Sequence, residues 1–80
     1  MRYVYLLQST SDSRKRYVGV TANLAKRLAE HNAGKSPHTS KFKPWQCIVA
    51  IRFTDDCKAD AFEQYLKSGS GHAFARRHFW

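Results

Sequence analysis

The chain has 80 residues and a formal net charge of +8, from 14 lysines and arginines against 6 acids. Its composition, with 42% hydrophobic and 14% aromatic residues, is typical of a folded domain and excludes a mainly disordered chain. No apolar run reaches the roughly 18 residues that a membrane span requires, and the two cysteines lack the spacing of a zinc site or a disulfide framework. We expect one small cytoplasmic domain over residues 1–80.

The positive charge is concentrated in residues 1–53, because residues 54–80 contain equal numbers of acids and bases. A small basic domain attracts polyanions, and nucleic acid bound through its phosphates is the simplest partner. An anionic membrane is the alternative, but the chain has neither a lipidation signal nor a basic amphipathic helix. We therefore expect a nucleic-acid partner, no membrane partner and no small-molecule cofactor.

Two strands and a helix are predicted in the first half of the chain. Residues 2–8 are rich in aromatic and β-branched residues and predict a strand, and residues 16–20 predict a second strand that completes a hairpin. Thr21 is the expected N-cap of a helix over residues 22–33. Gly34 stands where a helix-terminating glycine belongs.

A loop and a third strand follow. Residues 35–44 contain two prolines and three lysines, a composition that indicates an exposed loop. In residues 45–53 apolar side chains occupy every second position, from Trp45 to Phe53, and this alternation predicts the strongest strand of the chain. Its second face is also partly apolar, so we place this strand at the centre of the sheet.

The last third of the chain predicts two helices. Asp55 or Asp56 can cap a helix that runs to about Ser68, and residues 69–71, Gly-Ser-Gly, separate it from a short terminal helix. Such a segment can bind phosphate through its N–H groups, but a C-cap followed by an N-cap explains it better. The chain thus predicts an α+β fold of order ββαβαα, with a small three-stranded antiparallel sheet flanked by helices.

Arg27 and His31 lie one turn apart on the first predicted helix, at the edge of an apolar face that contains Leu24 and Leu28. The helix directs the guanidinium and the imidazole to the same side. They can act together on a substrate, or they can form a solvated basic helix edge. Spacing alone leaves both interpretations open.

Glu63 lies beside the predicted buried stripe of the second long helix. It can pair with Lys67 one turn later, an interaction worth only a few tenths of a kcal/mol. Alternatively, its carboxylate can bind a hard divalent cation such as Mg²⁺, which accepts one protein carboxylate and completes its octahedron with water and phosphate oxygens. Both interpretations remain open at this point.

Three tyrosines gather in the predicted hairpin. Tyr3 and Tyr5 share one face of the first strand, and Tyr17 opens the strand that pairs with it. Such tyrosines usually pack in a core, although a phenol beside an arginine or a metal ionises more easily and can take a proton from water. Gly19 in the second strand indicates a close approach to the backbone or a bulge.

In combination these residues resemble the GIY-YIG nuclease domain, in its small single-domain bacterial form, over nearly the whole chain. Tyr3-Val4-Tyr5 stands in place of the first tripeptide, and Tyr17-Val18-Gly19 matches the second. Arg27 and His31 follow at the family's helix spacing, and Glu63 falls in the helix where the family keeps its metal-binding glutamate. The first tripeptide lacks the family's glycine and isoleucine. The family often has an asparagine after the glutamate, but this chain has none there, so no asparagine is assigned to the site.

The resemblance implies a metal-dependent DNA endonuclease that hydrolyses phosphodiester bonds with an in-line water. Glu63 would hold Mg²⁺ or Mn²⁺ against the scissile phosphate, and Arg27 would stabilise the charge that develops there. Either Tyr5 or Tyr17 would be the general base, with His31 assisting or orienting it. Single-stranded or structured DNA is the favoured substrate, because the chain has no obvious further domain that reads sequence.

Basic residues of the hairpin turn and of the 35–44 loop are the expected phosphate contacts. They are Arg14, Arg16, Lys35, His38, Lys41 and Lys43. Phe42 and Trp45 can stack on bases, with core packing of Trp45 as the alternative. We expect a monomer.

The second interpretation is a non-catalytic nucleic-acid-binding module on the same scaffold. The enzyme requires Tyr5 and Tyr17 on adjacent antiparallel strands, with Arg27 facing their hydroxyls and Glu63 across the same cleft. This arrangement assumes that the apolar stripes of both long helices cover one face of the sheet. Glu63 on the opposite side of the sheet would favour the binding module.

Overall fold

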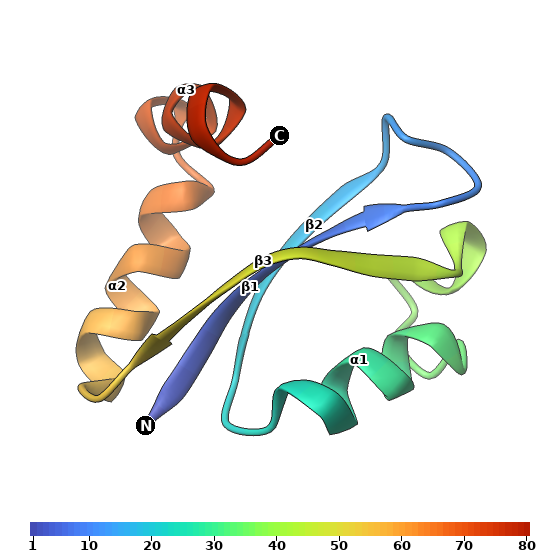
Figure 1. The fold of residues 1–80 in the computed structure, drawn as a ribbon, viewed down its shortest axis with the longest axis horizontal. Helices are drawn as coiled ribbons and strands as arrows, with labels where there is room; N and C mark the ends of the chain where they lie inside the picture. Colours follow the sequence, from blue (N-terminus) through green and yellow to red (C-terminus); the bar gives the residue numbers. More distant parts are fainter.

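The computed structural model describes residues 1–80 as a three-stranded antiparallel sheet with helices on both of its faces (Figure 1). The elements are β1 (Arg2–Ser9), β2 (Arg16–Thr21), α1 (Leu24–Asn32), the 3₁₀ turn η1 (Ser40–Phe42), β3 (Trp45–Phe53), α2 (Asp56–Leu66) and α3 (Gly69–His78). The predicted α+β class and the order ββαβαα are confirmed. None of the helices is long and apolar enough to cross a membrane.

The central strand of the sheet is β1, because the strand order is β2-β1-β3. Four consecutive residues of β1, Val4 to Leu7, are buried, as expected for a strand covered on both faces. The prediction that residues 45–53 form the central strand is wrong. β3 is an edge strand, and Ile48 on its second face remains 37% exposed.

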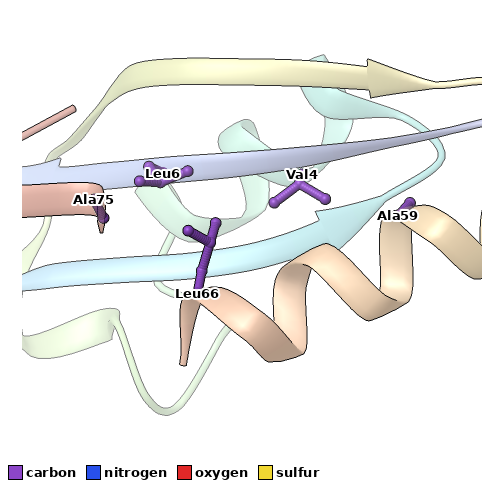
Figure 2. Close-up of a cluster of buried hydrophobic side chains, with 5 residues drawn as sticks. All are labelled: Val4, Leu6, Ala59, Leu66 and Ala75. Carbon is purple, nitrogen blue, oxygen red and sulfur yellow. The ribbon is translucent and has the colours of Figure 1, made fainter. Parts of the chain in front are cut away.

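One face of the sheet carries an apolar cluster. Val4 and Leu6 of β1 pack against Ala59 and Leu66 of α2 and Ala75 of α3, and all five side chains are buried (Figure 2). Phe62 of α2 is partly buried against this cluster. The two C-terminal helices therefore bury their apolar sides on the even-numbered residues of β1.

The opposite face is covered by α1. Tyr5 and Leu7, the odd-numbered residues of β1, form a second cluster with Trp45, and Leu24 and Leu28 of α1 pack against it. Figure 1 shows α1 and α2 on opposite sides of the sheet. The prediction that both helical stripes cover one face is therefore wrong. Successive side chains of β1 point to opposite faces, and each face requires its own cover.

The helix ends show how local sequence sets the boundaries. α1 begins two residues later than predicted, because the side chain of Asn23, rather than that of Thr21, accepts a hydrogen bond from Lys26 N. Thr21 is the last residue of β2, and its hydroxyl accepts from the backbone N–H of Asn23. Gly34 has a φ of 77°, the left-handed conformation expected just after a helix.

The C-terminal helices are capped by residues of the predicted kind. Asp55 caps α2 by accepting hydrogen bonds from Cys57 N and Lys58 N. α2 ends at Leu66, and Ser68 caps α3 by accepting from Gly71 N at 3.2 Å. The prediction that residues 69–71 separate the two helices is wrong, because these residues form the first turn of α3 and the capping residue Ser68 precedes them.

Candidate active site

A buried hydrogen-bond chain joins β1, α1 and the loop that follows α1. The hydroxyl of Tyr5 lies 3.1 Å from Nε2 of His31, and Nδ1 of His31 lies 2.7 Å from Oγ1 of Thr39. Tyr5 is 1% exposed, and His31 is fully buried. A neutral imidazole donates from one nitrogen and accepts at the other, so these two hydroxyls satisfy the whole ring.

Thr39 is part of this chain although the sequence analysis did not identify it. Its backbone carbonyl accepts a hydrogen bond from Trp45 Nε1 at 2.9 Å, which fixes the loop against the core. Asn32 at the end of α1 was also missed. Its Oδ1 accepts from Trp45 N at 2.5 Å, and its Nδ2 donates to Trp45 O at 3.2 Å. No spacing rule predicts such contacts between a loop, a helix end and a strand.

Burial favours the neutral forms of His31 and Tyr5. It lowers the pKa of His31, and the nearby charge of Arg27 lowers it further, although Glu30 opposes this effect. Burial, and next the neighbouring Tyr17, raises the pKa of Tyr5 to about 12, although Arg27 opposes the change. At neutral pH the site therefore contains an uncharged imidazole hydrogen-bonded to an intact phenol.

Tyr17 lies on β2 beside this chain and is partly exposed. Its ring centroid is 6.2 Å from that of Tyr5 and 4.9 Å from that of His31. Gly19, opposite Tyr5 in the sheet, makes this approach possible. A Cβ there would overlap the Tyr5 hydroxyl and lie 2.9 Å from Tyr17 Cε2. The predicted close approach at Gly19 is confirmed, and the pairing of β1 with β2 has no bulge.

Arg27 brings a positive charge to the two phenols. Its guanidinium lies beside Tyr5 and Tyr17, and its Nη1 is 3.1 Å from Oε1 of Glu30. Burial acts to lower the pKa of Arg27, but the Glu30 hydrogen bond and the phenols outweigh it, so the pKa rises above its usual value. Glu30 was not among the residues predicted from the sequence, although its position three residues after Arg27 is a recognised pairing distance.

We call Tyr5, Tyr17, Arg27 and His31 the tyrosine cluster. The structure brings these four predicted residues together from β1, β2 and α1. The two tyrosines lie on adjacent antiparallel strands, as predicted. A phosphate that reached the partly exposed Arg27 would also meet Tyr17, the more exposed of the two tyrosines.

Glu63 lies on α2, which covers the face of the sheet opposite the tyrosine cluster. It shares a helical stripe with Ala59 and Leu66 and is only 6% exposed. Its carboxylate accepts a hydrogen bond from Gln64 Nε2 at 2.9 Å and forms an ion pair with Lys67. The Glu63–Lys67 pair, one of the two interpretations from the sequence, is therefore present. No hydrogen bond or ion pair joins Glu63 to the tyrosine cluster, and the prediction that both helices face one cleft is wrong.

The donor set around Glu63 limits the metal that it can bind. No group of three or more histidine, cysteine, aspartate or glutamate side chains is placed to hold a metal ion. A single carboxylate fits a cation that takes its other ligands from water and substrate, as Mg²⁺ does. It does not fit a structural metal site enclosed by protein ligands.

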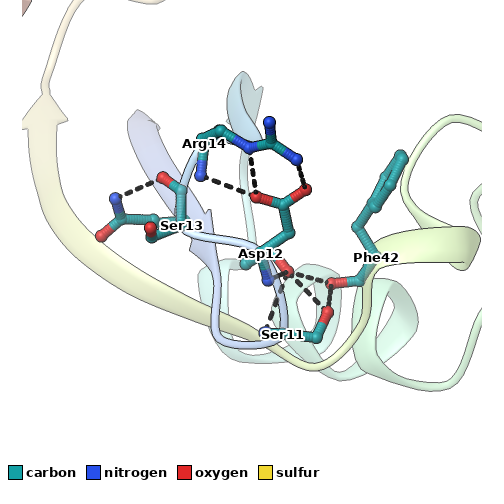
Figure 3. Close-up of polar contacts among 7 residues, drawn as sticks. Ser11, Asp12, Ser13, Arg14 and Phe42 are labelled. Carbon is teal, nitrogen blue, oxygen red and sulfur yellow. Dashed lines mark hydrogen bonds and ion pairs between the residues drawn. The ribbon is translucent and has the colours of Figure 1, made fainter.

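The predicted phosphate contacts lie in two neighbouring segments. The β1–β2 turn is tied to η1 by the Ser9 hydroxyl, which donates to Phe42 O at 2.5 Å, and Arg14 Nε pairs with Asp12 Oδ1 at 3.1 Å (Figure 3). Lys15 Nζ lies 4.9 Å from the centroid of the Phe42 ring. The predicted contacts in both segments are exposed: Arg14, Arg16, Lys35, His38, Lys41 and Lys43.

Trp45 does not belong to this surface. It is 5% exposed and packs with Tyr5 and Leu7, so stacking of Trp45 on nucleic-acid bases is excluded. Phe42 is partly exposed and keeps that possibility.

Comparison with protein families identifies the family of this chain. A family model described as the GIY-YIG catalytic domain matches residues 1–76. The chain belongs to the GIY-YIG family. The predicted resemblance is confirmed, and with it the assignment of the protein as an enzyme of the endonuclease type. The position of Glu63 on the opposite face meets the criterion given above for the non-catalytic module. The match to a catalytic domain over residues 1–76 outweighs this placement, so the module is not favoured.

Relatives of this GIY-YIG chain fall into two groups. A UPF0213 protein of Cupriavidus necator is 40% identical over 66 residues, which cover 81% of this chain and 67% of the relative. The structure-specific endonuclease subunit SLX1 homolog of Drosophila persimilis is 42% identical over 69 residues, 75% of this chain and 24% of the relative. SLX1 of Aspergillus niger is 34% identical over 84 residues, 94% of this chain and 20% of the relative. The chain thus spans about a quarter or less of these two SLX1 relatives.

Proposed function

We propose that this GIY-YIG protein is a metal-dependent endonuclease that hydrolyses phosphodiester bonds of single-stranded or structured DNA. The observation that carries the proposal is the tyrosine cluster, in which charged Arg27 and partly exposed Tyr17 adjoin the buried chain from Tyr5 through His31 to Thr39. Relatives named as subunits of a structure-specific endonuclease support the choice of substrate. The net charge of +8 supports DNA binding through phosphates.

Tyr17 is the better candidate for the general base. A phenol with a pKa of about 12, as in Tyr5, is almost never ionised at neutral pH, and Tyr5 is closed off from water. Tyr17 is partly exposed, so water can reach its side chain, and it lies beside the Arg27 guanidinium. We assign Tyr5 and His31 to positioning, since their hydrogen bonds fix the two rings against which Tyr17 packs.

Arg27 acts on the phosphate. A planar guanidinium can donate two parallel hydrogen bonds to phosphate oxygens and remains charged at any working pH. Glu30 holds the side chain in place from the same helix, at 3.1 Å. A preorganised donor of this kind stabilises the negative charge that grows on the phosphoryl oxygens during attack by water.

Glu63 is the residue that would hold the metal ion. When bound, Mg²⁺ or Mn²⁺ supplies a Lewis acid for the phosphate and for the leaving oxygen. α2 packs against β1 and against the edge strand β2, which carries Tyr17. Substrate bound at this edge of the sheet can meet residues from both faces, so α1 and α2 need not share one cleft.

A cleavage assay with single-stranded, branched and blunt duplex DNA in Mg²⁺, Mn²⁺ or EDTA tests this function. We expect metal-dependent cleavage by the wild type and none by Glu63→Gln, which keeps the side-chain volume and retains DNA binding. Asp60→Asn is the matched control, because Asp60 is an exposed carboxylate on the same helix and pairs with Arg2 at 2.8 Å. Its cleavage rate should equal that of the wild type.

The outcomes separate the parts of the proposal. Cleavage by Glu63→Gln at near wild-type rates would remove Glu63 from metal binding. Wild-type protein that binds all three DNAs but cleaves none in either metal would leave only the binding module.

A further inference from the structure

A concave site lies on the face opposite the tyrosine cluster, between the β1–β2 turn and α3. This cavity has a volume of about 440 Å³, and its lining includes Arg14, Arg16 and Arg76 but no acidic residue. Val18 and Leu66, which pack in or against the apolar cluster under α2 and α3, form part of its floor. The cavity therefore combines a cationic rim with an apolar base.

An aromatic ring completes the floor. Trp80 lines the cavity and packs against the apolar cluster, and the guanidinium carbon of Arg16 lies 4.9 Å from its ring centroid. A cation over an aromatic face is attracted to it, which orders both side chains. Arg14 is 86% exposed and shares its charge with Asp12, whereas Arg76 forms no ion pair. The rim thus keeps an excess of positive charge.

The chemistry of this lining matches a nucleotide. Guanidinium groups recognise phosphate oxygens in a planar fork. Apolar and aromatic surfaces hold bases regardless of sequence, because every base has an apolar face. A cavity of about 440 Å³ falls within the range of small-ligand sites, about 300–1,000 Å³, and accepts one nucleotide rather than a duplex.

We propose that the cavity binds one unpaired nucleotide of the DNA substrate. Its phosphate lies against Arg16 and Arg76, and its base lies on the floor that includes Val18 and Trp80. The inference rests on the proposed action on DNA and adds a second contact on the other face of the sheet. Such a contact favours substrates with a single-stranded branch over blunt duplex.

Binding in EDTA, which needs no cleavage, tests the site. The probes are a short 5′-phosphorylated oligothymidine and a blunt duplex, measured with wild type, Arg76→Ala and Arg77→Ala. Arg77 is the matched control, since it is exposed on the same helix, carries the same charge and does not line the cavity. We expect Arg76→Ala to weaken oligothymidine binding by about tenfold more than Arg77→Ala, with equal effects of both variants on the duplex.

The two tryptophans provide a second readout by NMR. Trp45 donates its indole N–H to Thr39 O and serves as an internal reference, while Trp80 reports on the cavity. Thymidine 5′-monophosphate should shift the Trp80 indole signal and leave that of Trp45 unchanged. Inorganic phosphate should shift neither. An equal Trp80 shift with inorganic phosphate would contradict base recognition.

The results distinguish this site from the nuclease function. Equal losses for Arg76→Ala and Arg77→Ala, or an unshifted Trp80 with the nucleotide, overturn the nucleotide site even if the wild type cleaves DNA. Wild-type protein that passes both tests but never cleaves keeps the nucleotide site and loses the proposed catalysis.

Discussion

The two faces of β1 differ in how they are held together, although they come from one strand of eight residues. Toward α2 and α3, Val4 and Leu6 pack with Ala59, Leu66 and Ala75, and Glu63 of α2 is the buried charged side chain on this side. Toward α1, Tyr5 packs beside buried His31 and Thr39, and no buried side-chain polar atom lacks a hydrogen-bond partner. Burying a polar group costs free energy unless it is paired, so specific hydrogen bonds order this second face.

The tyrosine cluster lies on the polar face, although Glu63, the proposed metal ligand, is buried on the apolar side among residues of α2. The apolar face supplies burial that needs no particular partner geometry. The polar face holds Tyr17 and Arg27 at positions that water can reach, supported by groups that it cannot reach. Because side chains alternate along a strand, a slip of one residue would exchange the faces and destroy both functions.

The largest effect is expected from Leu6→Ala on the apolar face. Leu6 is fully buried, so the truncation should lower the free energy of unfolding by about 2–5 kcal/mol. Urea unfolding measures the loss, with Ile48→Ala on an exposed edge position as control and an expected change within about 0.5 kcal/mol. Cleavage by folded Leu6→Ala at low temperature should stay near wild type, and a large loss there would contradict the division between faces.

Arg27→Ala on the polar face should reduce cleavage and leave stability nearly unchanged. We expect the rate of DNA cleavage to fall by about 10²–10³, as when other preorganised donors are removed. Its side chain is partly exposed, so unfolding by urea should change little. Lys26→Ala, an exposed cation one residue earlier, is the control and should cleave normally. An Arg27→Ala enzyme that lost only DNA affinity would reduce the residue to a phosphate clamp.

The apolar face was largely predictable from the sequence, because period-two and helical patterns determine which residues are buried. The stripe of Phe62 and Leu66 follows from spacing alone, and both residues pack in or against the apolar cluster. The sequence did not predict which face of the sheet each helix covers, because β1 carries apolar side chains on both of its faces. A partly apolar second face made residues 45–53 look central, but the ladder order depends on the chain as a whole.

The polar face was predictable only in part. The order and spacing of Tyr5, Tyr17, Arg27 and His31 indicated the cluster before its geometry was known. Thr39 was not identified, because its contact with His31 depends on how a loop folds back over a helix. Glu63 was predicted on the wrong face, because the spacing of residues along a helix does not define which side of a sheet the helix covers.

Replacing the two tyrosines separately sharpens the assignment of roles on the polar face. Tyr5→Phe leaves Nε2 of His31 buried without its partner and should lower the free energy of unfolding by about 1–3 kcal/mol. Tyr17→Phe should leave the unfolding free energy near that of wild type and reduce the cleavage rate more than Tyr5→Phe does. Single-turnover kinetics with urea unfolding measures both quantities. A greater rate loss for Tyr5→Phe, after correction for folding, would make Tyr5 the base.

The smallest effect is the pH dependence that His31 gives to the polar face. In the unfolded chain a histidine has a pKa of about 6.5, and burial lowers the pKa of His31 in the folded protein. Between these two values the unfolded state binds more protons, so stability decreases as pH falls below about 6.5. One proton limits the slope to about 1.4 kcal/mol per pH unit. Urea unfolding between pH 7.5 and 5 measures it.

Two variants determine whether this slope comes from His31. His31→Gln should flatten the curve, whereas His38→Ala, which removes an exposed loop histidine, should leave it unchanged. The lowered pKa values of Asp12 and Asp56 affect stability only at lower pH, because aspartates in an unfolded chain titrate near pH 3.9. If His31→Gln does not fold, an NMR titration of wild-type His31 replaces it, and a pKa at or above about 6.5 would contradict the buried neutral imidazole. Loss of the slope in His38→Ala would likewise place the titrating group outside the polar face.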